Sequence, residues 1–289
     1  MNIESQIRLF LLPRKPESHK GDYGRVFILA GSLGLSGACI LTSSAAIRSG
    51  AGLVTIGVPK SLLLPLSKRL TEAMMKPLPE TSSGTLSLKA FQPILKFLRN
   101  QDVFALGPGL SQEKETQTLI RKVVLSSTKP LVIDADGLNA FVEKTNSFRK
   151  LKAPAILTPH PGEFVRLFGG KIPVSKSERI KRALSISTKF KVVLVLKGNG
   201  TVVASPSGKF FVNTTGNPGM ATGGSGDVLV GVIAALLGQK LKPFDAAKAG
   251  VYLHGLAGDL AKKKFGEISL KAGDIIDFLP QTFKTILKR

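Results

Sequence analysis

The feature that most constrains this fold is a repeated alternation of short apolar strands with helices, in which each strand ends at a glycine-rich or polar loop. Successive strand and helix units produce a mostly parallel sheet with helices on both faces. Ligand sites of such sheets lie at the carboxyl ends of the strands. We therefore predict one three-layer α/β domain, residues 1–289. The predicted strands are 26–30, 53–58, 103–106, 131–133, 155–157 and 192–196.

The apolar periodicity between these strands predicts the helices. They are residues 39–48, 60–70, 86–99, a helix from near Gln112, a helix from Ala140, and residues 228–237, 244–264 and 272–287. Residues 77–85 and 134–139 are predicted to be loops. Residues 201–213 flank a Ser205–Gly208 turn and predict a β-hairpin, which should lie at one edge of the sheet.

Composition favours a single large domain in a reducing compartment. With 289 residues and 43% hydrophobic content, the chain can bury a sizeable core. Its one cysteine, Cys39, excludes an intramolecular disulfide and a multi-cysteine metal site, which fits the cytosol. Residues 1–16 resemble neither a signal peptide nor a membrane anchor, and the apolar run 228–237 is too short to span a bilayer. A soluble, cytoplasmic protein is expected.

The chain is strongly basic. Lys and Arg number 41 against 19 Asp and Glu, a net charge of +22. Such a field attracts nucleic acids, acidic membranes or nucleotides. The lysines are dispersed, and neither an arginine-rich arm nor zinc-finger cysteines accompany them. A generally basic surface is favoured over a dedicated nucleic-acid or membrane partner.

The stretch Asn217–Asp227 precedes the buried apolar run and carries the strongest chemical signal. We expect its four glycines to take positive φ, and Ser225 or Asp227 to cap the helix. Backbone N–H groups at a helix N-terminus bind anions, so Gly224, Ser225 and Gly226 form a candidate anion hole. Asp227 would repel a phosphate unless it acts as the base on the hydroxyl that receives it. An ordinary acidic helix cap is the alternative.

Two other loops are candidate ligand contacts. Gly31–Ala38 follows the first strand, but its spacing matches neither the dinucleotide fingerprint nor the P-loop. A plain tight turn remains the alternative there. His160 lies between two prolines at a strand end, because Thr158–Glu163 reads Thr-Pro-His-Pro-Gly-Glu. We expect His160 to contact ligand, with a structural role as the alternative.

Six signatures in order resemble the NAD(P)H-hydrate dehydratases of the ribokinase-like superfamily. The likeness spans nearly the whole chain, from Lys20 to Asp259. The signatures are Gly31–Ala38, Gly107–Leu110, Asp134–Asn139, Thr158–Glu163, Lys197–Thr201 and Asn217–Asp227.

This resemblance implies a reaction in which a nucleotide phosphorylates the 6-hydroxyl of the (6S) hydrate of NADH or NADPH, and loss of phosphate restores the reduced cofactor. Asp227 matches the catalytic base. The hydrate would contact Ala38, Gly109, His160 and Asp227. The nucleotide would contact Lys197, Gly198, Asn199, Gly200, Thr201 and Gly226.

The resemblance further implies Mg²⁺ as cofactor and ADP as phosphoryl donor, with ATP as the alternative. A homotetramer is expected, as is a separate epimerase, since about twenty residues precede the first signature. The nearest rival is a kinase of the same superfamily acting on a vitamin-precursor or sugar hydroxyl. A nucleotide-binding regulator without catalysis is a rival of another class.

Overall fold

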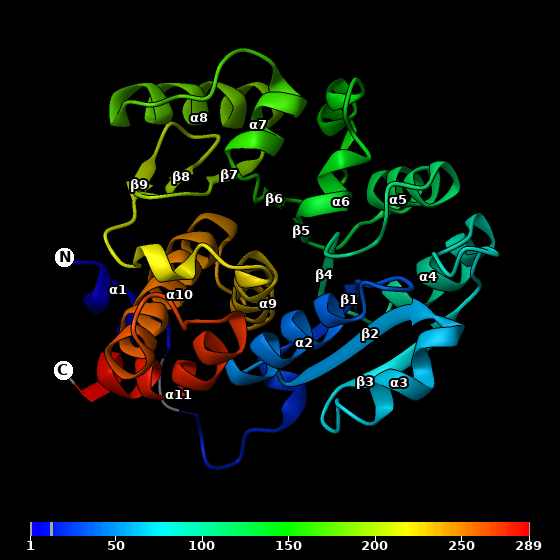
Figure 1. Cartoon of the computed structure of the whole chain (residues 1–289), viewed down its shortest axis with the longest axis horizontal. Coiled ribbons are helices and arrows are strands. Elements are labelled where there is room, and N and C mark those ends of the chain that lie inside the picture. Colours follow the sequence, from blue (N-terminus) through cyan, green and yellow to red (C-terminus); the bar gives the residue numbers. More distant parts are fainter. Residues whose placement is uncertain (1, 12–13, 289) are drawn as a thin grey trace.

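A nine-stranded sheet forms the middle layer of the computed structural model, which describes residues 2–11 and 14–288. Met1, Leu12, Pro13 and Arg289, part of the predicted domain and N-terminal stretch, lie outside the described residues. The strand order is β3-β2-β1-β4-β5-β6-β7-β8-β9 (Figure 1). The strands are β1 (Arg25–Leu29), β2 (Leu53–Pro59), β3 (Met74–Leu78), β4 (Val103–Leu106), β5 (Leu131–Ile133), β6 (Ala155–Leu157), β7 (Val193–Leu196), β8 (Val202–Ala204) and β9 (Phe210–Val212).

Helices cover both faces of this sheet (Figure 1). One face carries α1 (Ile3–Phe10), α2 (Gly37–Arg48), α3 (Leu63–Ser67), α9 (Ser225–Gly238), α10 (Pro243–Phe265) and α11 (Ala272–Lys288). The other carries α4 (Phe91–Leu98), α5 (Lys114–Ser126), α6 (Ala135–Asn139), α7 (Pro161–Phe168) and α8 (Lys176–Phe190).

The strands read as continuous apolar runs because both of their faces are buried. In β1, Val26 and Ile28 belong to the core beneath α2 and α9, whereas Phe27 and Leu29 belong to the core beneath α4 and α5. Successive side chains of a strand point to opposite faces, so a sheet between two helical layers requires apolar residues at every position.

Strands β1 to β7 run parallel, and β8 and β9 are antiparallel to their neighbours. The strand order reverses between β1 and β4, which pair directly although two strands separate them in the chain. Beyond their carboxyl ends the two loops meet, since Gly31 N–H donates to Pro108 O at 2.8 Å and Ser32 Oγ donates to Gly109 O at 2.9 Å. This topological switch point is where open α/β sheets bind ligands.

Most predicted elements are confirmed, including the edge hairpin, which β8 and β9 form. The helix predicted from Ala140 is wrong. Helix α6 begins at Ala135, directly after β5, and a turn follows it. Residues 134–139 are therefore a short helix rather than a loop, and the Asp136 and Asn139 side chains hydrogen-bond across it at 3.2 Å.

Three further elements were missed, and two predicted helices are shorter. Strand β3 extends into residues 77–85, where a loop was predicted, α1 lies in the N-terminal stretch, and α8 lies between the predicted strands 155–157 and 192–196. The helix predicted for 60–70 is a 3₁₀ turn followed by α3, and the one predicted for 86–99 is a 3₁₀ turn followed by α4.

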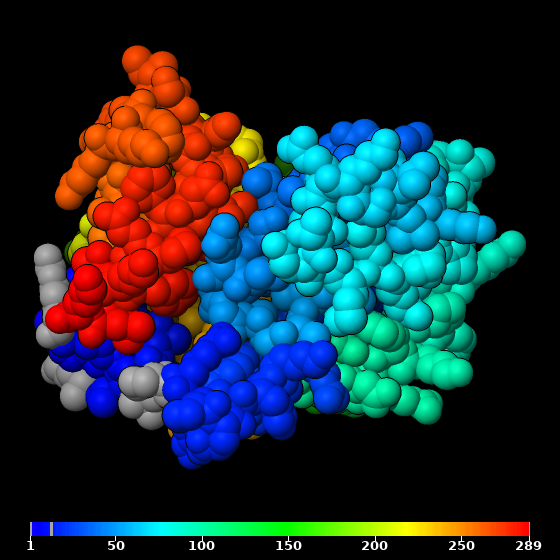
Figure 2. All heavy atoms as spheres, turned by 90° about the horizontal axis from the view of Figure 1, so that it is seen from below, coloured from blue at the N-terminus to red at the C-terminus, as the bar shows by residue number. Residues whose placement is uncertain are grey.

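The two terminal segments pack together. Figure 2 shows α11 in red beside the dark blue N-terminal segment on one face of the molecule. Ile7 of α1 is fully buried in the core to which α10 and α11 belong, and Lys248 Nζ of α10 donates to Gln6 Oε1 at 2.6 Å. Across residues 2–11 and 14–288, every helix falls short of the length or apolar character required to cross a bilayer.

Candidate active site

A cavity of about 700 Å³ lies at the carboxyl ends of β5, β6 and β7, where α9 begins. Its polar wall brings together side chains from four separate stretches: Asp134, His160 with Glu163, Lys197, and Asp227. The loop Gly198–Thr201 between β7 and β8, residues of the segment 213–222, and α10 line the other side. The sequence signatures at 134, 158–163, 197–201 and 217–227 therefore converge at one site.

Helix α9 begins without a side-chain cap, which corrects the expectation that Ser225 or Asp227 caps it. Gly224 is the N-cap residue, with φ of 87° and no side-chain cap hydrogen bond. A Cβ on Gly224 would lie 2.3 Å from Leu41 Cδ1 of α2, so a larger residue would force Leu41 to move in addition to the strain of the positive φ. Of the four glycines predicted to take positive φ, only Gly224 does.

The first turn of α9 presents free backbone donors. Ser225 N–H donates to Thr222 O at 3.4 Å, and Val228 N–H donates to Gly224 O at 3.1 Å. Between them, the N–H groups of Gly226 and Asp227 have no acceptor among the described residues. Such unpaired donors lie at the positive end of the helix dipole and favour an anion. Of the predicted anion-hole residues, Gly226 therefore has a free N–H, as does Asp227 next to it, whereas the Ser225 N–H already has an acceptor.

An ion pair lies directly against this turn. Lys197 Nζ contacts Asp134 Oδ1 at 2.7 Å, and Glu163 Oε2 lies 4.0 Å from the same amine. A Cβ on Gly226 would lie 3.2 Å from Lys197 Nζ and 3.5 Å from Asp134 Oδ2. A side chain at position 226 would therefore crowd the amine of Lys197.

The carboxyl group of Asp227 titrates near neutrality. Burial raises its pKa from the ordinary 3.8 to about 7, and repulsion from Asp134 adds to this, while Lys197 opposes it. Burial lowers the pKa of Lys197, but Asp134 and Glu163 outweigh that effect and raise it, so the amine stays charged. A carboxyl group poised near pH 7 suits general base catalysis.

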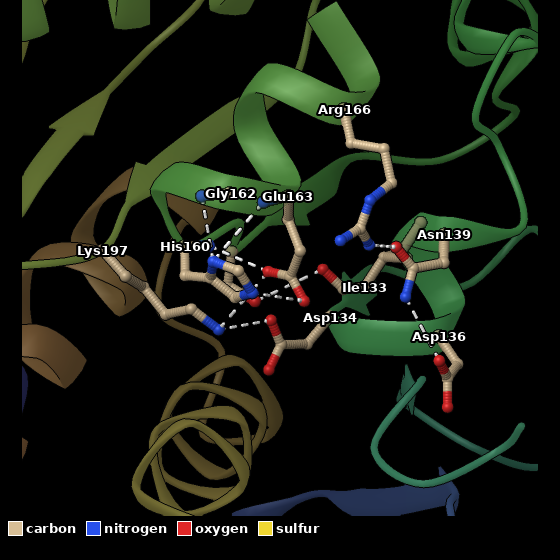
Figure 3. A network of polar contacts seen from close by, with 10 residues as sticks. Ile133, Asp134, Asp136, Asn139, His160, Gly162, Glu163, Arg166 and Lys197 are labelled. Atoms are coloured by element: carbon tan, nitrogen blue, oxygen red, sulfur yellow. Dashed lines mark hydrogen bonds and ion pairs between the residues drawn. The ribbon is translucent and has the colours of Figure 1, made fainter. Parts of the chain in front are cut away.

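His160 has a structural role as well as a place on the cavity. It is the N-cap of α7, and its Nδ1 accepts hydrogen bonds from the backbone N–H groups of Gly162 at 3.0 Å and Glu163 at 3.4 Å (Figure 3). The backbone N–H of His160 donates to Glu163 Oε2 at 2.8 Å. Burial, and the charge of Lys197, lower its pKa. Because Nδ1 accepts hydrogen bonds in the neutral ring, Nε2 carries the proton, and Nε2 lies 3.5 Å from Glu163 Oε1.

Figure 3 also shows a polar chain that runs from this site toward the switch point. Arg166 of α7 donates to Asn139 Oδ1 at 2.6 Å, and Asn139 donates to Asp136 Oδ1 at 3.2 Å. Asp136 Oδ2 in turn accepts from the N–H of Ser111 at 2.9 Å. The loop after β4 is thereby tied to α6.

Hydrogen bonds from an arginine that the sequence analysis did not identify fix the backbone where the segment Lys197–Thr201 begins. Arg179 of α8 donates from Nη2 to Leu196 O at 3.1 Å and to Lys197 O at 3.0 Å. Gly198 has φ of 125°, and Thr201 Oγ1 donates to Gly198 O at 2.8 Å. Gly198, Asn199, Gly200 and Thr201 all line the cavity. Lys197 differs from them, because its amine points to Asp134.

Two predicted substrate residues, Ala38 and Gly109, lie at the switch point instead. A Cβ on Gly109 would be 3.0 Å from the Cβ of Ala38, so the two are adjacent. Neither is among the described residues that line the cavity. Burial, and to a lesser extent the charge of Asp227, raise the pKa of neighbouring Cys39 to about 12.

Helix α10 contributes Asp259 and His254 to the site, and the sequence analysis did not identify either residue as part of it. Asp259 Oδ2 accepts from Gly216 N–H at 2.8 Å, and its Oδ1 accepts from Asn217 Nδ2 at 2.9 Å. His254 is 8% exposed, lines the cavity and contacts Ser225 O at 3.0 Å. Arg179 and His254 lie on helices outside the site signatures, whereas Asp134 and Glu163 stand within signatures and were identifiable there.

The described residues contain no group of three or more His, Cys, Asp or Glu side chains that would hold a metal ion by themselves. Nucleotide-bound Mg²⁺ needs less, since one or two carboxylates and the phosphates suffice. Asp134 and Asp227 supply two carboxylates whose mutual repulsion raises the pKa of Asp227. A divalent cation fits this donor set.

Comparisons with known proteins agree on one family. The family model described as NAD(P)H-hydrate dehydratase matches residues 26–281. The bifunctional NAD(P)H-hydrate repair enzyme of Moorella thermoacetica is 46% identical over 276 residues, 95% of this chain and 52% of that protein. The ADP-dependent (S)-NAD(P)H-hydrate dehydratase of Bacillus subtilis is 34% identical over 281 residues, 97% of this chain and 96% of that protein. The chain thus spans about half the length of the bifunctional relatives it matches.

A solved structure is similar over almost the whole chain. It is that of the ADP/ATP-dependent NAD(P)H-hydrate dehydratase of Bacillus subtilis, co-crystallised with ATP and Mg²⁺. The TM-score is 0.84 at 33% identity, covering 98% of this chain and 97% of that chain. The predicted ribokinase-like α/β fold is confirmed.

Proposed function

Since the chain belongs to the NAD(P)H-hydrate dehydratase family, we propose that it restores NADH or NADPH from the (6S) hydrate at the expense of a nucleotide phosphoryl group. One observation carries the proposal. The Asp227 carboxyl group, with a pKa of about 7, lies at the first turn of α9 beside two free N–H groups and opposite the Lys197–Asp134 pair. A base, an anion site and a cation thereby meet at one point.

Asp227 acts in the first step. Its carboxylate takes the proton of the 6-hydroxyl as that oxygen attacks the terminal phosphorus, and the bond to the nucleotide breaks. The N–H groups of Gly226 and Asp227 hold the charge that develops on the transferred group. In the second step phosphate leaves C6 with the bonding electron pair, a proton leaves C5, and the 5,6 double bond is restored.

The nucleotide occupies the part of the cavity between the hairpin and α10. Support comes from Gly198 to Thr201, whose backbone is open, and from the segment 213–222, which Asp259 anchors. Lys197 neutralises phosphate charge while its amine remains on Asp134. The sequence analysis assigned the same role, nucleotide contact, to Lys197 and to the four residues that follow it, whereas we now propose a separate role for Lys197.

The hydrate lies with its nicotinamide end near Asp227 and His160, and extends toward Ala38 and Gly109 at the switch point. Ala38 and Asp227 lie on α2 and α9, two helices that pack against each other, which supports a site that includes both regions. An elongated dinucleotide needs both regions, whereas a vitamin-sized substrate needs only one.

Asp134 and Asp227 would hold Mg²⁺ together with the phosphates, and the ion would neutralise charge on the transferred group. The Bacillus subtilis relative is named for ADP, and its solved structure was co-crystallised with ATP and Mg²⁺. We propose ADP as the donor for this chain. Cytoplasmic location and a homotetramer are likewise proposed, and light scattering measures the oligomeric state.

The decisive experiment incubates the protein with chemically prepared NADPH hydrate, Mg²⁺ and either ADP or ATP, and follows the return of reduced-nicotinamide absorbance. Recovery that requires nucleotide supports the proposal. A vitamin-precursor or sugar kinase would leave the hydrate untouched and would transfer phosphate to hydroxyethylthiazole, hydroxymethylpyrimidine or ribose. A regulator would bind nucleotide without turnover. Either result contradicts the dehydratase assignment.

A further inference from the structure

Helix α9 holds its two free N–H groups on an unusually weak first turn. Gly224 and Gly226 flank its first residue, and the helix has no side-chain cap. Helix ends fray, and glycine lowers helix stability further. An anion site nevertheless requires N–H groups that already point at the anion before it arrives. Another part of the molecule must therefore restrain this turn.

His254 of α10 meets that requirement. Its Nε2 lies 3.0 Å from Ser225 O and 3.4 Å from Ser225 Oγ. A carbonyl oxygen only accepts, so Nε2 carries the proton and donates it to Ser225. Burial lowers the pKa of His254 to about 4, and the charge of Lys197 also lowers it, which keeps the ring neutral at physiological pH.

The Ser225 carbonyl and the Gly226 N–H belong to the same peptide group. A trans peptide is planar, and its C=O and N–H point in opposite directions. A hydrogen bond that holds the Ser225 oxygen toward the His254 ring therefore also fixes the direction of the Gly226 N–H, which points away from that ring. The free donor of the anion hole is oriented from outside its own helix.

We propose that His254 is a positioning residue for phosphoryl transfer, which sets the direction of the Gly226 N–H by donating a hydrogen bond from Nε2 to Ser225 O. This proposal rests on the proposed function for its kinetic test. The ring's other nitrogen, Nδ1, has no hydrogen-bond partner in the described part of the chain and plays no part in this role.

Two amide substitutions separate positioning from packing. In His254→Gln the side-chain nitrogen reaches the place of Nε2, whereas in His254→Asn it reaches only that of Nδ1. We expect H254N to lower kcat about 10- to 100-fold, because a misdirected donor loses transition-state stabilisation. H254Q should stay within about threefold of the wild type, and nucleotide KM should hardly change in either. His19→Asn, an exposed N-cap histidine near the amino end of β1, is the matched control and should leave both constants unchanged.

A second readout does not depend on turnover. Labelling with ¹³C-carbonyl serine and ¹⁵N-glycine confines the amide spectrum to Ser–Gly peptides, among them Ser225–Gly226. Titration with inorganic phosphate should shift the Gly226 signal in the wild type and in H254Q, with affinity reduced at least about fivefold in H254N.

Equal behaviour of H254N and H254Q in phosphate binding would overturn the proposal, as would a loss confined to nucleotide KM. An inactive wild type that still shows the predicted phosphate response would reject the dehydratase function and leave the positioning role intact.

Discussion

Replacing Asp227 with asparagine separates a catalytic base from a structural carboxylate. The amide keeps the shape of the side chain but cannot take a proton from the substrate hydroxyl. Base catalysis typically contributes about 10²- to 10⁴-fold, so kcat should fall by that factor while the nucleotide still binds. A helix cap would behave differently, since its loss costs about 0.5–2 kcal/mol of stability with little effect on rate.

The effect of the same substitution on stability follows from the pKa of Asp227. Folding raises this pKa from 3.8 to about 7, so the folded state disfavours the charged form. The resulting penalty is absent below pH 3.8, grows by about 1.4 kcal/mol per pH unit as the pH rises toward 7, and is complete above it. The full penalty is about 4 kcal/mol at most, because solvent reaches part of the side chain.

Asp227→Asn should therefore stabilise the protein, and the gain should be larger at pH 8 than at pH 5 by up to about 2.7 kcal/mol. Urea unfolding of both proteins at the two pH values measures this difference, since groups common to both cancel. Loss of stability together with near-normal kcat would refute the reasoning and restore the cap interpretation.

Three further substitutions test the surrounding residues. Gly198→Val should weaken nucleotide binding at least about tenfold, because a β-branched residue cannot adopt the φ of 125° that Gly198 has. Calorimetry measures this affinity. A folded variant with unchanged affinity would show that this segment is not part of the nucleotide site. His160→Ala should lower the free energy of unfolding by about 0.5–2 kcal/mol, whereas His160→Asn should not, because asparagine can still cap α7. Both variants should raise KM for the hydrate. Unchanged kinetic constants would make the histidine purely structural. Asp134→Asn removes the repulsion on Asp227 and frees Lys197, so the pKa of Asp227 should fall. In a pH–rate profile, the acid limb of kcat/KM should therefore move to lower pH. An acid limb that stays in place or moves to higher pH would contradict the electrostatic account.

The layered architecture was predictable because its signals are local. Strands buried on both faces are apolar at every position, as in Phe27 and Ile28, and a glycine or polar loop marks where each strand ends. The hairpin at the sheet edge followed from the Ser205–Gly208 turn between two strands. Errors arose where local signals were ambiguous, as at Ala135, which begins a helix with φ of 45° in a stretch that resembles a loop.

What the sequence by itself determined is the order of strands, loops and helices, and with it the edge of the sheet at which Asp227, His160 and Lys197 would lie. Spacing along the chain could not show that Lys197 pairs with Asp134 at 2.7 Å, that Gly224 rather than a polar residue is the N-cap of α9, or that His254 reaches Ser225. The Lys197–Asp134 and His254–Ser225 contacts join residues 63 and 29 positions apart, and burial shifts the pKa of the groups at the site. Only tertiary packing sets those distances, because the chemistry of this site depends on which charges and donors are brought together out of water.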